Sequence, residues 1–75
     1  MKKLNRVTFD PNVMGGKPCI RGLRVTVGTI VGLVATGYAT ADILKAYPYL
    51  EAADIDEALT YAACLAEEET VEFAR

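Results

Sequence analysis

The chain has 75 residues and a mass of 8.1 kDa, the size of one small domain whose own hydrophobic core is marginal. It contains no His, Ser, Trp or Gln, which excludes Ser-His-Asp and Cys-His catalysis and imidazole metal ligands. Its two cysteines, Cys19 and Cys64, are too few for a disulfide scaffold or a zinc site. Oligomerisation is the expected source of further stability, and we expect a homodimer.

The net charge of −2 conceals two oppositely charged parts of the chain. Residues 1–24 carry six Lys or Arg against Asp10, a balance of +5. Residues 25–75 carry two Lys or Arg against nine carboxylates, a balance of −7. The sequence therefore has a basic front and an acidic back. No apolar segment follows the basic start as it would in a signal peptide, and the longest run without a charge, residues 25–41, is too short for a membrane span. We therefore expect a cytoplasmic protein with reduced thiols and no membrane partner.

Residues 1–26 are predicted to form a β arm. Residues 7–9 have the alternation of a short strand and are followed by a turn cluster. Residues 20–23 have the pattern of a hairpin connection in which Gly22 takes a positive φ, and residues 24–27 follow as the returning strand. Before this hairpin, the first six residues are interpreted as a flexible basic tail.

Residues 27–75 are predicted to be helical, beginning with two short helices. The first spans residues 28–36 and ends at Gly37, a residue type common just after a helix. Thr40 is the expected N-cap of the second, which Pro48 stops.

A third helix is predicted to begin near residues 51–54 and to run towards residue 69. Its apolar residues recur at the helical period and should form the buried stripe: Ile55, Ala58, Leu59, Ala62, Leu65 and Ala66. Three helices with a short second one predict a mainly α fold, a helix-turn-helix core that forms a single domain with the β arm.

Two segments of the chain together resemble a known family. They are DPNVMGGKPCIRGLRV at residues 10–25 and GYATADILKAYPYL at residues 37–50. The combination resembles the small bacterial and archaeal family called domain of unknown function 433, whose members are often described as VapB-type antitoxins. The resemblance covers residues 5–66. The chain departs from the family pattern at Leu23, where a small polar residue is usual, and at Glu51, where Ser or Thr often caps the helix.

The resemblance implies a homeodomain-like or winged helix-turn-helix fold and a particular biological role. Such an antitoxin would bind and block a neighbouring PIN-like ribonuclease toxin, and the pair would repress their own operon by binding operator DNA. The protein would then be a binding protein and not an enzyme, without a cofactor. The alternative is a dimeric interaction or regulatory module that binds neither a toxin nor DNA.

The basic arm is the better candidate for a nucleic-acid contact, because the third helix has no Lys or Arg between residues 54 and 73. The candidate residues are Lys3, Arg6, Lys17, Arg21 and Arg24. Two other interpretations of these charges stay open. They could protect an exposed strand edge from aggregation, or they could pack on the acidic helix of a second subunit.

The acidic helical half is the expected contact with a basic toxin cleft. The candidate residues are Asp54, Asp56, Glu57, Tyr61 and Glu68. A helix start rich in carboxylates more often complements the helix dipole than binds Mg²⁺, so we expect no metal. The other tyrosines are expected to serve core or dimer packing more often than base stacking.

Overall fold

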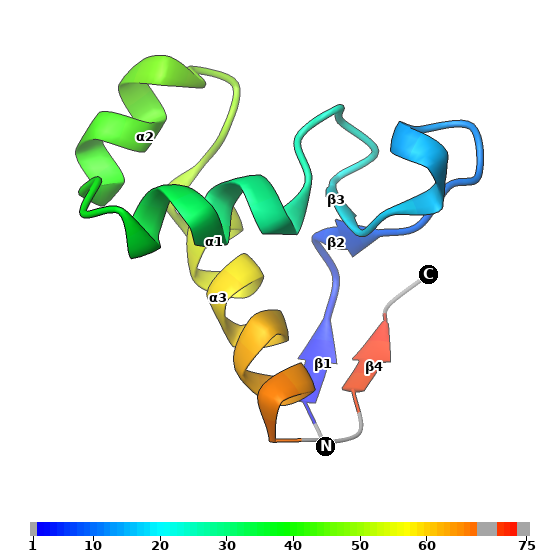
Figure 1. The fold of residues 1–75 in the computed structure, drawn as a ribbon. Helices are drawn as coiled ribbons and strands as arrows, with labels where there is room; N and C mark the ends of the chain where they lie inside the picture. Colours follow the sequence, from blue (N-terminus) through cyan, green and yellow to red (C-terminus); the bar gives the residue numbers. More distant parts are fainter. Residues whose placement is uncertain (1, 68–70, 74–75) are drawn as a thin grey trace.

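The computed structural model of the protein describes residues 2–67 and 71–73. Within them the architecture is mainly helical, as expected, with three α-helices and two small sheets (Figure 1). In chain order the elements are β1 (Lys2–Leu4), β2 (Val7–Thr8), the 3₁₀ turn η1 (Met14–Gly16), β3 (Cys19–Ile20), α1 (Val27–Ala35), α2 (Thr40–Ala46), α3 (Ala52–Ala66) and β4 (Val71–Phe73).

The predicted hairpin connection is present. β2 and β3 pair antiparallel, with Val7 opposite Ile20. The N–H of Leu23 donates to the Ile20 carbonyl at 2.7 Å, and Gly22 takes a φ of +70°, as its lack of a side chain permits. The predicted returning strand over residues 24–27 was wrong: this segment makes an isolated bridge between Cys19 and Thr26, and Val27 already begins α1.

The first two helices lie close to their predicted positions. α1 begins at Val27, where the Thr26 hydroxyl caps it by accepting the Thr29 N–H at 3.1 Å. Gly37, just beyond the end of α1, has a φ of +97°. The predicted cap of α2 was wrong. Thr40 is already helical, and the Asp42 carboxylate accepts the N–H of the N-cap Ala39 at 3.3 Å.

The C-terminal part of the chain differs from the prediction. α3 ends at Ala66 and not near residue 69, since three successive glutamates from Glu67 would lie at the negative end of the helix dipole. β4 then pairs in parallel with β1, with Lys3 opposite Glu72. The segment interpreted as a flexible tail therefore contains a strand.

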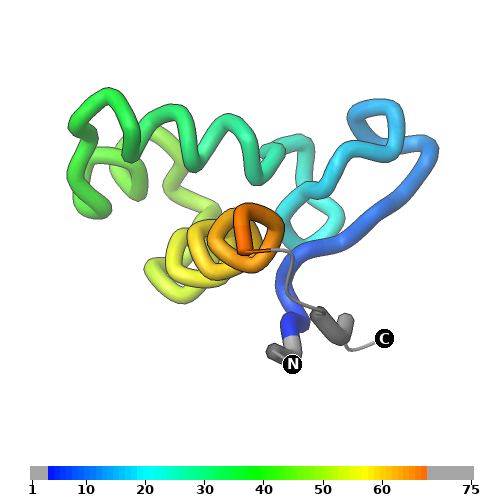
Figure 2. The backbone as a smooth tube through the Cα atoms, turned by 60° about the horizontal axis from the view of Figure 1, so that its bottom comes forward, coloured from blue at the N-terminus to red at the C-terminus, as the bar shows by residue number. Residues whose placement is uncertain are grey.

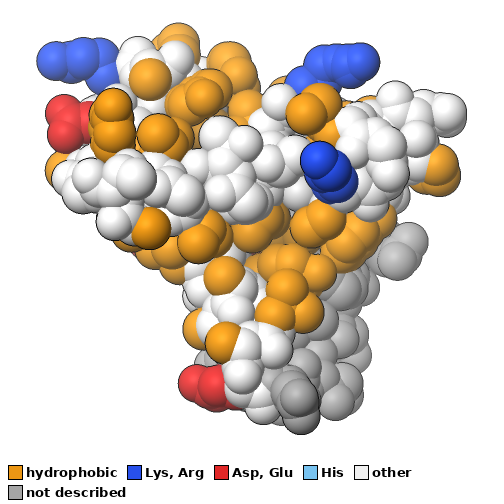
Figure 3. All heavy atoms as spheres, viewed as in Figure 1, with side chains coloured by type: hydrophobic (Ala, Val, Ile, Leu, Met, Phe, Trp, Pro, Cys, Tyr) orange, Lys and Arg blue, Asp and Glu red, His pale blue; other side chains and the backbone are white. Residues whose placement is uncertain are grey.

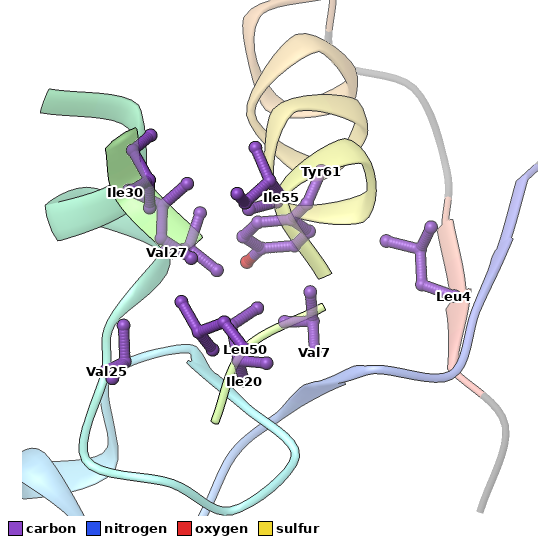
Figure 4. Close-up of a cluster of buried hydrophobic side chains, with 11 residues drawn as sticks. Leu4, Val7, Ile20, Val25, Val27, Ile30, Leu50, Ile55 and Tyr61 are labelled. Carbon is purple, nitrogen blue, oxygen red and sulfur yellow. The ribbon is translucent and has the colours of Figure 1, made fainter. Parts of the chain in front are cut away.

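The core lies where α1, α3 and the hairpin meet (Figure 4). Figure 2, in which α3 is seen nearly along its axis, places α1 on one side of it and the N-terminal segment on another. Of the predicted α3 stripe, Ile55 and Ala58 are buried, but Leu65 is 60% exposed. Tyr61 and Cys64 are buried instead, because both α1 and β2 pack on this side of α3.

Candidate functional site

Asp54 is a charged side chain in the hydrophobic interior. It lies in the first turn of α3 and is 0% exposed. Its carboxylate accepts the N–H of Glu51 at 2.8 Å, which satisfies one of the free donors at the helix start. A buried carboxylate is costly unless it is paired and hydrogen-bonded, so the rest of its surroundings decide whether the fold tolerates it.

Two arginines of the β arm hold this carboxylate. Arg21 binds it with a two-pronged contact, from Nε to Oδ1 at 3.1 Å and from Nη2 to Oδ2 at 2.9 Å. Arg6 donates from Nη1 to Oδ1 at 2.8 Å and also reaches the Glu51 carboxylate at 2.7 Å. We call this group, Asp54 with Arg6, Arg21 and Glu51, the Asp54 clamp.

The ion pairs of the clamp stabilise the charged forms of Asp54, Arg6 and Arg21. Burial alone would raise the pKa of Asp54, but hydrogen bonds from Arg21, Arg6 and the Glu51 N–H outweigh it, and the pKa falls to about 2. Hydrogen bonds to Glu51 and Asp54 raise the pKa of Arg6 further above its ordinary value. Hydrogen bonding to Asp54 raises the pKa of Arg21. Asp54, Arg6 and Arg21 are therefore ionised at neutral pH.

Arg21 also joins the two halves of the sequence motif. Its Nη2 donates to the carbonyl of Tyr49 at 2.9 Å, in the turn between α2 and α3. Its own N–H donates to the Arg6 carbonyl at 2.7 Å, and its φ is +46°, an uncommon value for a residue with a side chain. The IRG segment thus binds the YPYL segment directly, and the clamp orients both on α3.

Glu57, one turn further along α3, holds the backbone of the same arm. Its carboxylate accepts the N–H of Asn5 at 3.3 Å, that of Val7 at 2.8 Å, and that of Arg6. Asn5 and Arg6 lie between β1 and β2, and Val7 is the first residue of β2. Glu57 therefore fixes the path by which the arm crosses α3.

The structure separates the predicted basic residues into two groups. Arg6 and Arg21 lie in the clamp. Lys17 and Arg24 are exposed and make no ion pair with any residue that the structure describes. Lys3 lies in β1, and its side chain is outside the described part of the chain.

The predicted acidic residues are divided in the same way. Asp54 and Glu57 hold the arm, and Tyr61 is buried at 8% exposure, where it contributes to the core. Asp56 alone of the described candidates is exposed. Glu68 lies outside the described residues.

The sequence suggested a contact between the basic arm and the acidic helix only as a contact between two subunits. The structure places that contact within one chain. A signal was available in the spacing of α3. Asp54 precedes the buried Ala58 by four residues and Tyr61 by seven, which places its carboxylate on the apolar face of the helix.

The described residues contain neither a metal-binding cluster nor a membrane-spanning helix. Among residues 2–67 and 71–73, no three Asp, Glu, His or Cys side chains form a group that could hold a metal ion. In the same part of the chain, no helix is long and apolar enough to cross a membrane.

Comparisons with known proteins place the chain among uncharacterised relatives. A family model described as "Protein of unknown function (DUF433)" matches residues 7–62. The uncharacterized protein y4eO of Sinorhizobium fredii is 41% identical over 56 residues, which are 75% of this chain and 25% of that protein. This chain therefore spans about a quarter of the length of that curated relative.

A solved structure shares the fold. The crystal structure of a DUF433 member protein from Anabaena variabilis superimposes with a TM-score of 0.78 at 33% sequence identity. The match covers 85% of this chain and 63% of the Anabaena chain. The family match includes Arg21, Glu51 and Asp54 of the clamp and also Glu57, whereas Arg6 lies just before the matched region.

Proposed function

This chain belongs to the DUF433 family, whose function is unknown, and we propose that it is a VapB-like antitoxin that binds and blocks a PIN-like ribonuclease. In this proposal the chain is not an enzyme, and α2 and α3 form its helix-turn-helix pair. The clamp and the arm set the position of α3, whose remaining surface carries the contact with the toxin.

The observation that carries the proposal is the acidic surface left on α3 after the clamp has formed. Asp56 and Glu67 are exposed and make no ion pair with any described residue. The side chains beside Asp56 at the helix start are the exposed Ala52 and Ala53, so a partner can approach closely. A ribonuclease cleft must attract RNA phosphates, so an acidic helix is complementary to it in charge.

Co-purification with the product of the adjacent gene tests this proposal. We expect a stable complex, and we expect Asp56→Lys to weaken it at least tenfold, because the substitution places a cation against a basic cleft. Asp42→Lys is the charge-matched control, since Asp42 is an exposed carboxylate on α2. Circular dichroism first checks that losing its hydrogen bond with the Ala39 N–H leaves α2 folded, and its effect on binding should then stay within threefold. Binding would be measured by calorimetry, with ribonuclease inhibition as a second readout.

Two results would contradict the toxin proposal. One is the absence of a complex with the neighbouring gene product, which would leave the dimeric interaction module as the better description. The other is a complex that Asp56→Lys and Asp42→Lys weaken equally, which would remove the α3 surface from the interface.

Operator DNA is a second candidate partner, supported by the exposure of Lys17 and Arg24. Both flank the hairpin, and neither is neutralised by a described carboxylate. Arg6 and Arg21 contribute less in this proposal, because the clamp already neutralises their charges.

A promoter-fragment titration against salt tests the DNA contact. We expect the double variant Lys17→Ala with Arg24→Ala to weaken binding and to reduce the salt slope by about 2 for each chain bound, since one phosphate contact contributes about 0.9. Lys45→Ala is the control, as Lys45 is an exposed cation on α2, away from the hairpin. An unchanged slope in the double variant would exclude the arm from the DNA interface.

A further inference from the structure

The apolar face of α3 continues beyond the part that the rest of the chain covers. Leu65 follows the buried Tyr61 by four residues and Ala58 by seven, so all three lie on one face of the helix. Yet Leu65 is 60% exposed, the largest exposure among the described large apolar side chains. In Figure 1, α1 crosses α3 near its first turns and does not reach its last turns, beside which β1 lies.

Of the charges outside the clamp, those of Lys17 and Arg24 lie at the opposite end of the molecule from that of Glu67. Lys17 follows η1, and Arg24 lies in the turn before α1, both in the upper part of Figure 1. Glu67 is exposed at the lower end of α3, and Glu68 and Glu69 follow it in the sequence. Figure 3 shows a face whose blue side chains lie only in its upper half, with red side chains at the upper left and at the lower end, and with hydrophobic and uncharged atoms in between.

The size of the chain is compatible with a partner of its own kind. Its accessible surface is 4748 Å², and a standard interface covers about 800 Å² of each partner, so a dimer would cover about one sixth of it. A chain of 75 residues gains stability from such burial, since its own core is small.

We infer that a second copy of this chain covers this face in an antiparallel, two-fold arrangement. Each copy then places its acidic α3 end beside the hairpin end of the other, so Glu67 faces Lys17 and Arg24, and Leu65 is buried between the copies. A side-by-side parallel arrangement would bring like charges together at both ends. A head-to-tail arrangement would satisfy the charges but leave Leu65 exposed and the assembly open.

This dimer contact shares Glu67 with the proposed toxin contact and Lys17 and Arg24 with the proposed DNA contact, but it does not use Asp56. It is tested by sedimentation of the full chain over a concentration series at low salt. We expect a species of about 16 kDa, twice 8.1 kDa, and a dissociation constant raised at least tenfold by Leu65→Asp. Leu65→Ala should raise it less, and circular dichroism should report an unchanged helix content in both, because Leu65 is exposed in the single chain.

Charge reversal tests the orientation of the two copies. Lys17→Glu with Arg24→Glu should weaken the dimer at least tenfold, and adding Glu67→Lys should restore most of the loss. Lys45→Glu is the control and should change the constant less than threefold. An 8 kDa species at every concentration overturns the inference, as does a dimer that Leu65→Asp leaves intact. A dimer that loses affinity with Leu65→Asp but not with the charge reversal overturns the antiparallel arrangement.

Discussion

Replacing Asp54 with Asn should lower the free energy of unfolding by about 3 kcal/mol. The carboxylate accepts from Arg21 at two atoms, from Arg6 and from the Glu51 N–H. An amide removes the negative charge and turns an N–H₂ group towards at least one of these donors, so Arg21 loses its counter-charge and Arg6 keeps only that of Glu51. A chain of this length has a total stability of about 4 to 11 kcal/mol, so the loss is a large part of it.

Urea unfolding followed by circular dichroism measures this effect. Asp56→Asn is the matched control, because Asp56 lies two residues away on the same helix but is exposed. It should change stability by less than about 0.5 kcal/mol. If both variants were equally stable, the clamp would not be a structural element, and Arg6 and Arg21 would again be candidates for ligand binding.

Replacing Glu57 with Ala should release the N-terminal arm from α3. Three backbone N–H groups, of Asn5, Arg6 and Val7, lose their acceptor, and part-buried donors without an acceptor cost stability. We expect a loss of about 2 kcal/mol, because water replaces some of the bonds. Glu57→Gln keeps one oxygen that can accept from Arg6 and Val7, so its loss should be smaller.

Amide hydrogen exchange locates the release within the chain. Relative to the unsubstituted chain, Glu57→Ala should accelerate the exchange of the amides of residues 5–7 more than that of the α1 amides, because the hydrogen bonds of α1 are internal to the helix. Equal acceleration throughout the chain would mean that Glu57 acts on global stability alone and does not hold the arm locally.

The helices could be predicted from the sequence because their signals are local. Gly37 and Pro48 mark the ends of α1 and α2, and the apolar period marks α3. The pairing of β1 with β4 could not, because it joins segments about 69 residues apart and depends on where α3 ends. The apolar period of α3 predicted Leu65 in the core, but Leu65 is exposed. The period alone does not show how far α1 extends along α3.

The candidate site was predicted less well than the fold. The sequence identifies Arg6, Arg21 and Asp54 as candidates, but it does not identify Glu51 or show which of these residues meet, since a carboxylate at a helix start is most often exposed. Asp54 and Asp56 are nearly equivalent in local sequence, yet one is buried and the other exposed. That difference follows from the direction of α3 relative to the arm, a property of the tertiary packing.

Arg6 and Arg21 serve the fold by neutralising the buried carboxylate of Asp54. The most direct test is a titration of the Asp54 carboxylate by carbon-detected NMR. We predict a midpoint near pH 2, because the pKa falls from 3.8 to about 2 in the folded chain. The folded pKa lies below the unfolded one, so the stability it contributes, about 2 kcal/mol, is present above pH 4 and lost as the pH falls towards 2. A midpoint at 3.8 or above would contradict the claim.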